Sequence, residues 1–119
     1  MVIFIVTRHP GASEWIRNHG IVGTLVTQWS DELTQSLHKG DTVIGTLPMG
    51  PVEEILNTGA RFILLELPAI RFSQRGQELS PGEMSDPPAR LREVVSIHFR
   101  DLSDDDIRSL SGGGINRDV

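Results

Sequence analysis

The sequence predicts a single-domain α/β fold with a mostly parallel sheet and helices on both of its faces. Strand-like and helix-like segments alternate along most of the chain, which is the order that builds a parallel sheet through helical crossovers. The main strand-like segments are continuous apolar runs, as expected for strands covered on both faces. A length of 119 residues with 38% apolar content suits one domain of ordinary size.

Five short segments suit strands because they are apolar or β-branched and end at turn residues. The first is a fully apolar run, whereas the second mixes β-branched with polar side chains, which suits an edge of the sheet. In chain order, the five expected strands are residues 2–7, 21–29, 42–47, 61–67 and 95–99.

Four segments between these strands suit helices. The first ends at His19-Gly20, the second begins at Ser30, whose hydroxyl can cap it, and the third accepts Pro51 at its first position. In chain order, the expected helices are residues 12–18, a short helix from residue 30 to the turn at 39–41, residues 51–59, and residues 89–94. Residues 71–88 suit a long loop with at most one helical turn, and residues 101–119 suit a polar tail that we expect to be flexible.

Composition excludes several classes of protein. Cysteine is absent, which excludes disulfides and thiolate metal sites, and no signal-peptide pattern opens the chain, so we expect a cytoplasmic protein. The longest apolar runs fall far below the roughly 20 residues that span a bilayer. A net charge of −5 with only 11 basic residues disfavours long nucleic acids as partners. A small anion remains suitable, because a few converging arginines can hold it locally.

Two loops stand out because each follows a strand and should lie at the same edge of a parallel sheet. They are residues 7–11 and 45–50. Arg8 and His9 lie at the carboxyl end of the first strand, beside a helix N-terminus that attracts anions, so we expect a phosphate-containing ligand there. The same positions are also compatible with ordinary turn residues. The residues in or beside these loops that offer a hydroxyl or close backbone approach to a ligand are Thr7, Gly11, Ser13, Gly45, Thr46 and Gly50.

Each candidate side chain has a functional and a structural interpretation. Arg8 can neutralise a phosphate or its transition state, or it can form a surface ion pair with Glu14. His9 can act as a general acid or base, because histidine titrates near neutrality, or it can cap or pack against the helix. Arg75, in the long loop, can fold over an occupied site as part of a lid, or it can be solvated.

The remaining aromatic, histidine and acidic residues favour structural roles. Trp15 can stack on a base but is more typical of a core residue, and Trp29 has no assigned place. The histidines lack metal-ligand spacing, and the acidic run at residues 104–106 suits a helix start or a solvated tail. No phosphate-binding loop of nucleotide triphosphatases, no dinucleotide fingerprint and no nucleophile elbow is present.

Three motifs resemble a small family of CRISPR-associated accessory proteins linked to Type III systems. They are Val6-Thr7-Arg8-His9-Pro10-Gly11-Ala12-x-x-Trp15-Ile16, Gly40-Asp41-x-Val43-Ile44-Gly45-Thr46-Leu47-Pro48 and Arg75-Gly76-x-Glu78-Leu79-Ser80. The resemblance covers about residues 1–100. It implies a Rossmann-like domain over that range, related to the CRISPR-associated Rossmann fold and associated with ring nuclease activity.

The resemblance also implies a ligand and a mechanism. A prokaryotic, cytoplasmic homodimer would bind a cyclic oligoadenylate, cyclic tetra-adenylate above all, and cut it to linear products with a 2′,3′-cyclic phosphate. No metal and no cofactor would be needed, because the ribose 2′-hydroxyl attacks the neighbouring phosphorus. Arg8 would lie against the scissile phosphate and His9 would assist proton transfer. The residues that would shape the binding site around the ring are Thr7, Gly11, Ser13, Gly45, Thr46 and Pro48. Two alternatives stay open: a sponge or sensor that binds the ring without cutting it, and a partner-binding protein of the defence complex.

Overall fold

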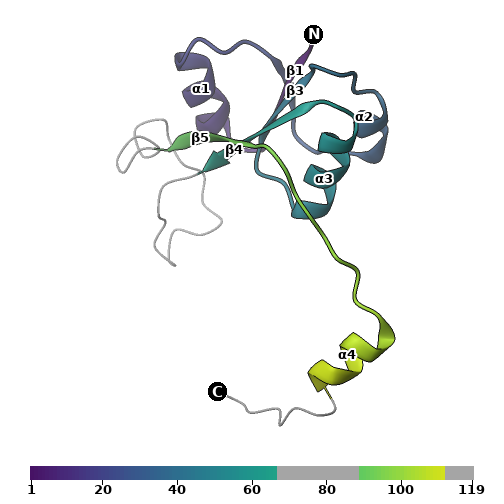
Figure 1. Cartoon of the computed structure of the whole chain (residues 1–119). Coiled ribbons are helices and arrows are strands. Elements are labelled where there is room, and N and C mark those ends of the chain that lie inside the picture. Colours follow the sequence, from purple (N-terminus) through teal and green to yellow (C-terminus); the bar gives the residue numbers. More distant parts are fainter. Residues whose placement is uncertain (67–88, 112–119) are drawn as a thin grey trace, which may run out of the picture.

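The computed structural model is built around a five-stranded sheet with helices packed on both of its faces (Figure 1). The structure describes residues 1–66 and 89–111. The elements in chain order are β1 (Ile3–Val6), α1 (Pro10–Asn18), β2 (Thr24–Val26), α2 (Asp31–Gln35), β3 (Thr42–Gly45), α3 (Met49–Asn57), β4 (Arg61–Glu66), β5 (Arg90–Val94) and α4 (Asp104–Ser111).

The strand order is β2-β1-β3-β4-β5, with the first four strands parallel and β5 antiparallel to β4. Val6 at the end of β1 pairs with Val26 of β2 on one side and with Gly45 of β3 on the other. The carboxyl ends of these three strands are therefore neighbours. The expected α/β fold with a mostly parallel sheet is confirmed, and it is compatible with a Rossmann-like domain.

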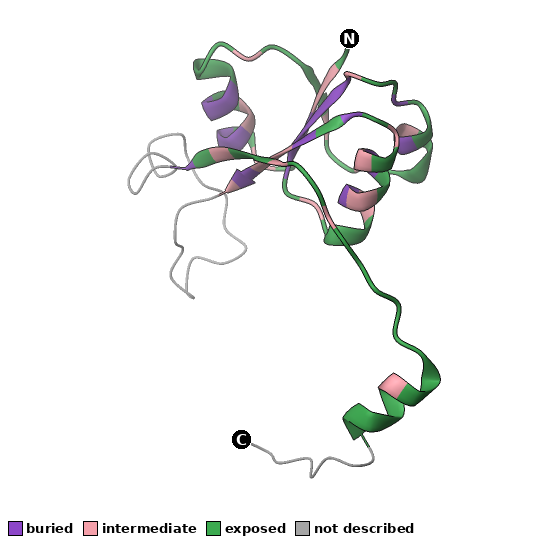
Figure 2. Ribbon diagram, in the orientation of Figure 1, coloured by how far each residue is buried: buried purple, intermediate pink, exposed green. Residues whose placement is uncertain are grey.

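The core has two layers because successive strand residues face opposite sides of the sheet. On one face, Ala12, Trp15 and Ile16 of α1 pack with Ile5 and other odd-numbered positions of β1 and β4. On the other face, Val52 and Ile55 of α3 pack with Val6, Val43 and Phe62. Figure 2 shows these buried positions along the strands and on the inner sides of the helices. Burial on both faces explains why the strands are continuous apolar runs.

A buried carboxylate ties the start of β1 to the turn before β3. Asp41 accepts hydrogen bonds from the backbone N–H of His38 at 2.8 Å and of Val2 at 2.9 Å. These two backbone donors hold the pKa of Asp41 below its ordinary value of 3.8. The ionised form is therefore the one that the fold stabilises.

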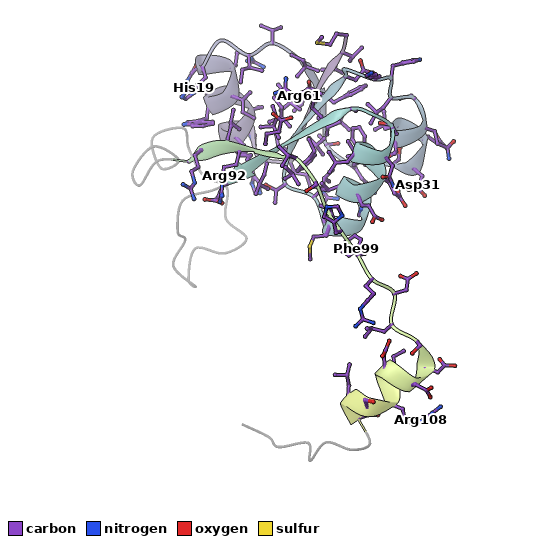
Figure 3. All side chains as sticks on the ribbon, in the orientation of Figure 1. His19, Asp31, Arg61, Arg92, Phe99 and Arg108 are labelled. Carbon is purple, nitrogen blue, oxygen red and sulfur yellow. The ribbon has the colours of Figure 1, made fainter. Side chains whose placement is uncertain are left out.

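The prediction of a helix at residues 89–94 is wrong, because β5 occupies this segment. Its arginines and glutamate are good helix formers, which made the local pattern misleading. In the structure they line the exposed edge strand and form ion pairs with β4, where pairing outweighs propensity (Figure 3). The pairs are Arg61–Glu93 at 2.8 Å, Arg90–Glu66 at 2.6 Å and Arg92–Glu66 at 3.1 Å.

The prediction of a last strand at residues 95–99 is also wrong. Val94 already pairs with Phe62, and β4 begins only one residue earlier at Arg61, so residues beyond 94 have almost no strand beside them. The chain instead leaves the sheet without regular structure (Figure 1).

Within the expected polar tail, residues 104–111 form α4, which lies away from the sheet (Figure 1). The Ser103 hydroxyl accepts from the Asp106 N–H at 3.1 Å, and the Asp106 carboxylate accepts from the Ser103 N–H at 3.0 Å. This reciprocal pair is a capping box, so the acidic run starts a helix as expected. The expectations for residues 67, 71–88 and 112–119 lie outside the described residues. Among the described helices, none has the length and apolar character needed to cross a bilayer.

Candidate functional site

A cavity of about 580 Å³ opens at the carboxyl edge of the sheet, where β1 meets β2 and β3. Its walls come from the ends of these three strands and from the residues that begin α1, α2 and α3. The lining residues are Val6, Thr7, Arg8, His9, Ala12, Thr27, Gln28, Trp29, Ser30, Asp31, Thr46, Leu47, Pro48, Pro51 and Leu65.

The topology explains why the cavity lies there. The chain leaves β1 toward α1 on one face of the sheet, and it leaves the neighbouring β3 toward α3 on the opposite face. A crevice opens between connections that diverge in this way, and ligands of open α/β sheets bind at such a switch point. The N-termini of α1 and α3 both border the cavity, and their unpaired N–H groups favour an anion.

Arg8 lies on the cavity wall with its charge uncompensated. Its Nε donates to the Thr27 carbonyl at 3.4 Å, and the side chain is exposed. Over residues 1–66 and 89–111 it forms no ion pair with a carboxylate, and it does not pair with Glu14. The guanidinium is therefore held at one edge by the segment that follows β2 and can present its other N–H groups to an anion.

His9 immediately precedes α1, but its side chain does not cap the helix. Its backbone carbonyl accepts from the N–H groups of Ala12 and Ser13 at 3.0 and 3.3 Å. Its ring Nδ1 is buried and has no hydrogen-bond partner in the described part of the chain. A buried polar atom without a partner is costly, and His9 is one of the residues that line the cavity, so a ligand group that reached this nitrogen would gain a hydrogen bond.

The three hydroxyls proposed for phosphate binding differ in what they can donate. The Thr46 hydroxyl donates to the Leu65 carbonyl at 2.8 Å, and the Ser13 hydroxyl donates to the Pro10 carbonyl at 3.0 Å. Both hydroxyl protons are therefore already used in hydrogen bonds within the protein. The Thr7 oxygen accepts from the His9 N–H at 3.0 Å, which leaves its own proton available. Thr7 is thus the hydroxyl best placed to donate to a phosphate oxygen.

The other expected ligand residues occupy different surroundings. Pro48 lines the cavity just before α3, whereas Gly11 and Ser13 lie in the first turn of α1 and are not among the lining residues. Gly45 is also outside the lining, and a Cβ there would come within 2.5 Å of the Val6 carbonyl oxygen. The close approach of β1 and β3 therefore accounts for this glycine. Arg75 lies outside the described residues.

Sequence reasoning missed the wall that follows β2. Thr27, Gln28, Ser30 and Asp31 all line the cavity, and so does Trp29. The strand before them has only three residues and is largely exposed, so its pattern was weak. The available signal was a strand-like segment followed directly by the helix-capping Ser30, whose oxygen accepts from the Leu33 N–H at 3.3 Å.

The structure places the two tryptophans in different surroundings. Trp15 is buried in the core at 6% exposure, where its ring lies 4.2 Å from the His19 ring, so its structural interpretation is confirmed. Trp29 is half-buried beside the cavity. No group of three or more histidine, aspartate or glutamate side chains suited to a metal ion occurs in the described ranges.

Comparison with known proteins places the chain in a family. Residues 4–97 match the family described as "Putative CRISPR-associated protein (Cas_VVA1548)". This range contains the five strands except for Ile3, the first residue of β1, and it contains the whole lining of the cavity. No curated protein and no solved structure matches the chain. Because the match covers well over half of its length, the chain belongs to the CRISPR-associated Cas_VVA1548 family.

Proposed function

We propose that this protein is a ring nuclease that degrades cyclic tetra-adenylate to linear products with a 2′,3′-cyclic phosphate and so switches off Type III CRISPR signalling. Membership of a CRISPR-associated family supports the biological setting, and the resemblance of its motifs to Type III accessory proteins supports the ligand. The observation that carries the chemistry is Arg8, which forms no ion pair with the described residues and lies beside a helix N-terminus in the cavity at the switch point. This combination suits a phosphate.

Each cleavage in the proposed reaction breaks one phosphodiester bond without added water or metal, and two cleavages at opposite positions of the ring give two linear di-adenylates. The ribose 2′-oxygen attacks the adjacent phosphorus in line and forms a P–O bond, and the bond to the 5′-oxygen of the next nucleotide breaks. The 2′-hydroxyl loses its proton and the departing 5′-oxygen gains one. The protein then has two tasks, which are to hold the attacking and leaving oxygens in line and to stabilise the charge that develops on phosphorus.

Named side chains suit these tasks. The Arg8 guanidinium can neutralise the non-bridging phosphate oxygens through two parallel N–H groups. Thr7 can donate its hydroxyl proton to the same phosphate. The His9 ring can accept or return the proton that moves during the reaction, because its Nδ1 has no hydrogen-bond partner among the described residues.

The size of the cavity favours a homodimer for this reaction. A volume of about 580 Å³ lies within the range of pockets for drug-sized ligands, which is too small to enclose a ring of four nucleotides. Two copies related by a two-fold axis would each take part of the ring. Every contact would then occur twice, so few residues per chain suffice.

The first experiment incubates the protein with cyclic tetra-adenylate in EDTA and resolves the products by chromatography and mass spectrometry. The expected product is linear di-adenylate with a 2′,3′-cyclic phosphate. If the ring stays intact but co-elutes with the protein on gel filtration, the protein is a sponge or sensor instead. If the ring stays intact and does not bind, the proposed function is wrong.

Variants then test the site. Removing one charge-stabilising group typically lowers the rate by about 100-fold, which we expect for Arg8→Ala, with partial recovery in Arg8→Lys because lysine keeps the charge but loses the fork. Arg17→Ala is the matched control, since Arg17 is exposed in the last turn of α1 and lies outside the cavity lining. If Arg8→Ala and His9→Ala both cleave at the wild-type rate, the cavity is not the catalytic site.

A further inference from the structure

The cavity is lined by two chemically different segments. The segment that follows β1 carries Arg8 and His9 and leads into the N-terminus of α1, which favours negative charge. The segment that follows β2 carries Trp29, with Gln28 before it in the chain and Asp31 at the start of α2. Figure 3 labels Asp31 at this start of α2. The Asp31 carboxylate repels a phosphate, so the second segment suits an uncharged part of the ligand.

We propose that Trp29 is a base-stacking residue, on which a purine base of the ligand lies while its phosphate faces Arg8. The proposal rests on the proposed function only in that the ligand is a nucleotide. A flat indole surface attracts bases of any sequence, because every base has a π-face. The flanking carboxylate and amide can accept hydrogen bonds from the exocyclic amino group of adenine.

The indole ring is held in place before any ligand arrives. Its Nε1–H donates to the Thr34 hydroxyl at 2.8 Å, and its plane meets the Phe4 ring edge-on, with centroids 5.6 Å apart at 77°. Thr34 is itself buried, and its hydroxyl donates to the Ser30 carbonyl at 3.4 Å. The polar group of Trp29 is therefore satisfied internally, and stacking is the interaction that its cavity-facing surface can still make. A ring that is already oriented loses little entropy on binding.

The chain offers a direct spectroscopic readout. It has two tryptophans, and Trp15 is buried in the core on the α1 side of the sheet. Replacing Trp15 with phenylalanine leaves Trp29 as the single tryptophan, so its fluorescence reports on the cavity alone. We expect adenosine 5′-monophosphate to quench this fluorescence and ribose 5-phosphate, which lacks the base, to leave it nearly unchanged.

Trp29→Leu removes the aromatic surface and keeps most of the apolar volume. Stacking on an aromatic side chain contributes about 1–3 kcal/mol per base. We therefore expect calorimetry to show that the Kd for adenosine 5′-monophosphate rises by about 10-fold or more. The affinity for ribose 5-phosphate should change by less than about twofold, since Arg8 still holds the phosphate. Trp29→Phe should keep most of the affinity, because it retains an aromatic face. Circular dichroism of each variant checks that the fold is intact.

The proposal is overturned if adenosine 5′-monophosphate binds no more tightly than ribose 5-phosphate, or if Trp29→Leu weakens both ligands equally. Should Trp29→Leu fail to fold, Thr34→Val supplies a second test, because it removes the hydrogen bond that orients the indole ring without altering the cavity lining. It should weaken the binding of adenosine 5′-monophosphate and leave that of ribose 5-phosphate unchanged, and equal effects on both ligands would overturn the proposal. Quenching without ring cleavage would reject the proposed nuclease and keep the stacking residue. Ring cleavage without quenching of the Trp29 fluorescence would keep the proposed nuclease and reject the stacking residue.

Discussion

Replacing Gly45 with alanine should push β3 away from its neighbour β1. A Cβ at this position would lie 2.5 Å from the Val6 carbonyl oxygen and 3.1 Å from the Val6 Cβ. Real Cβ atoms do not approach backbone closer than 3.0 Å, so the contact must open by at least 0.5 Å (3.0 minus 2.5). The two Val6 atoms belong to the backbone of β1 or are attached directly to it, so neither can rotate away from a Cβ on β3.

The expected cost is large for one methyl group. Forcing extra volume into a packed region costs about 1–3 kcal/mol, and the backbone clash at Gly45 puts the expected value at about 2 kcal/mol or more. Gly50→Ala is the control, because a Cβ there meets nothing within 4 Å. The helix propensity that alanine gains in α3 is opposed by its clash with Pro51 in helical geometry, so this variant should stay within about 0.5 kcal/mol of wild type.

Urea denaturation followed by circular dichroism measures both variants. With a urea dependence of about 2 kcal/mol per molar, the Gly45→Ala midpoint should fall by about 1 M, whereas the Gly50→Ala midpoint should barely move. Ring cleavage should fall with Gly45→Ala even well below its melting temperature, because Val6 and Gly45 are followed directly by the loops that line the cavity. Equal stability of the two variants would refute the assignment of Gly45 as a close-approach position.

Three further predictions concern stability. Because the folded-state pKa of Asp41 lies below the ordinary 3.8 of the unfolded chain, its ionised form stabilises the fold above pH 3.8, and this contribution disappears as the pH falls through the folded-state value. Asp41→Asn should therefore lower the urea midpoint at pH 7, and the gap to wild type should close in acid; a pH-independent gap would contradict this. Glu66→Gln should lower the melting temperature slightly at low salt and not at high salt, because its two arginine pairs are exposed. An effect that survives high salt would contradict the electrostatic explanation. Ser30→Ala removes the cap of α2 and should cost about 1 kcal/mol, or about 4 °C in melting temperature, whereas an unchanged melting temperature would show that the cap contributes nothing.

Much of the candidate site followed from local sequence pattern. The apolar run before Thr7 and the run before Thr46 each predicted a buried strand, and parallel strands place their carboxyl ends at one edge. The structure confirms that Arg8 and Pro48 lie on the walls of one cavity. Periodicity and connection order were sufficient here, because they depend on residues close together in the chain.

Other features of the site depend on distant contacts. The side of the cavity carrying Trp29 exists because β2 pairs with β1, and the Thr46 proton is used because β4 brings the Leu65 carbonyl within 2.8 Å. Neither partner can be identified from the residues nearby. The sequence placed hydroxyls at the edge of the sheet, but hydrogen bonding across strands decides which of them can donate to a ligand.

The sequence by itself determined the order of strands and helices up to β4, the two-sided burial of the sheet and the two loops that border the cavity. Only the tertiary structure decided that residues 90–94 form a strand and that residues 95–99 do not. Local preferences differ by less than about 1 kcal/mol per residue, so they settle an element only where no neighbour competes. At Arg90–Val94 the open edge of β4 supplies backbone partners and opposite charges. Val94 pairs with Phe62, and β4 begins at Arg61, so the residues after Val94 have almost no such edge beside them.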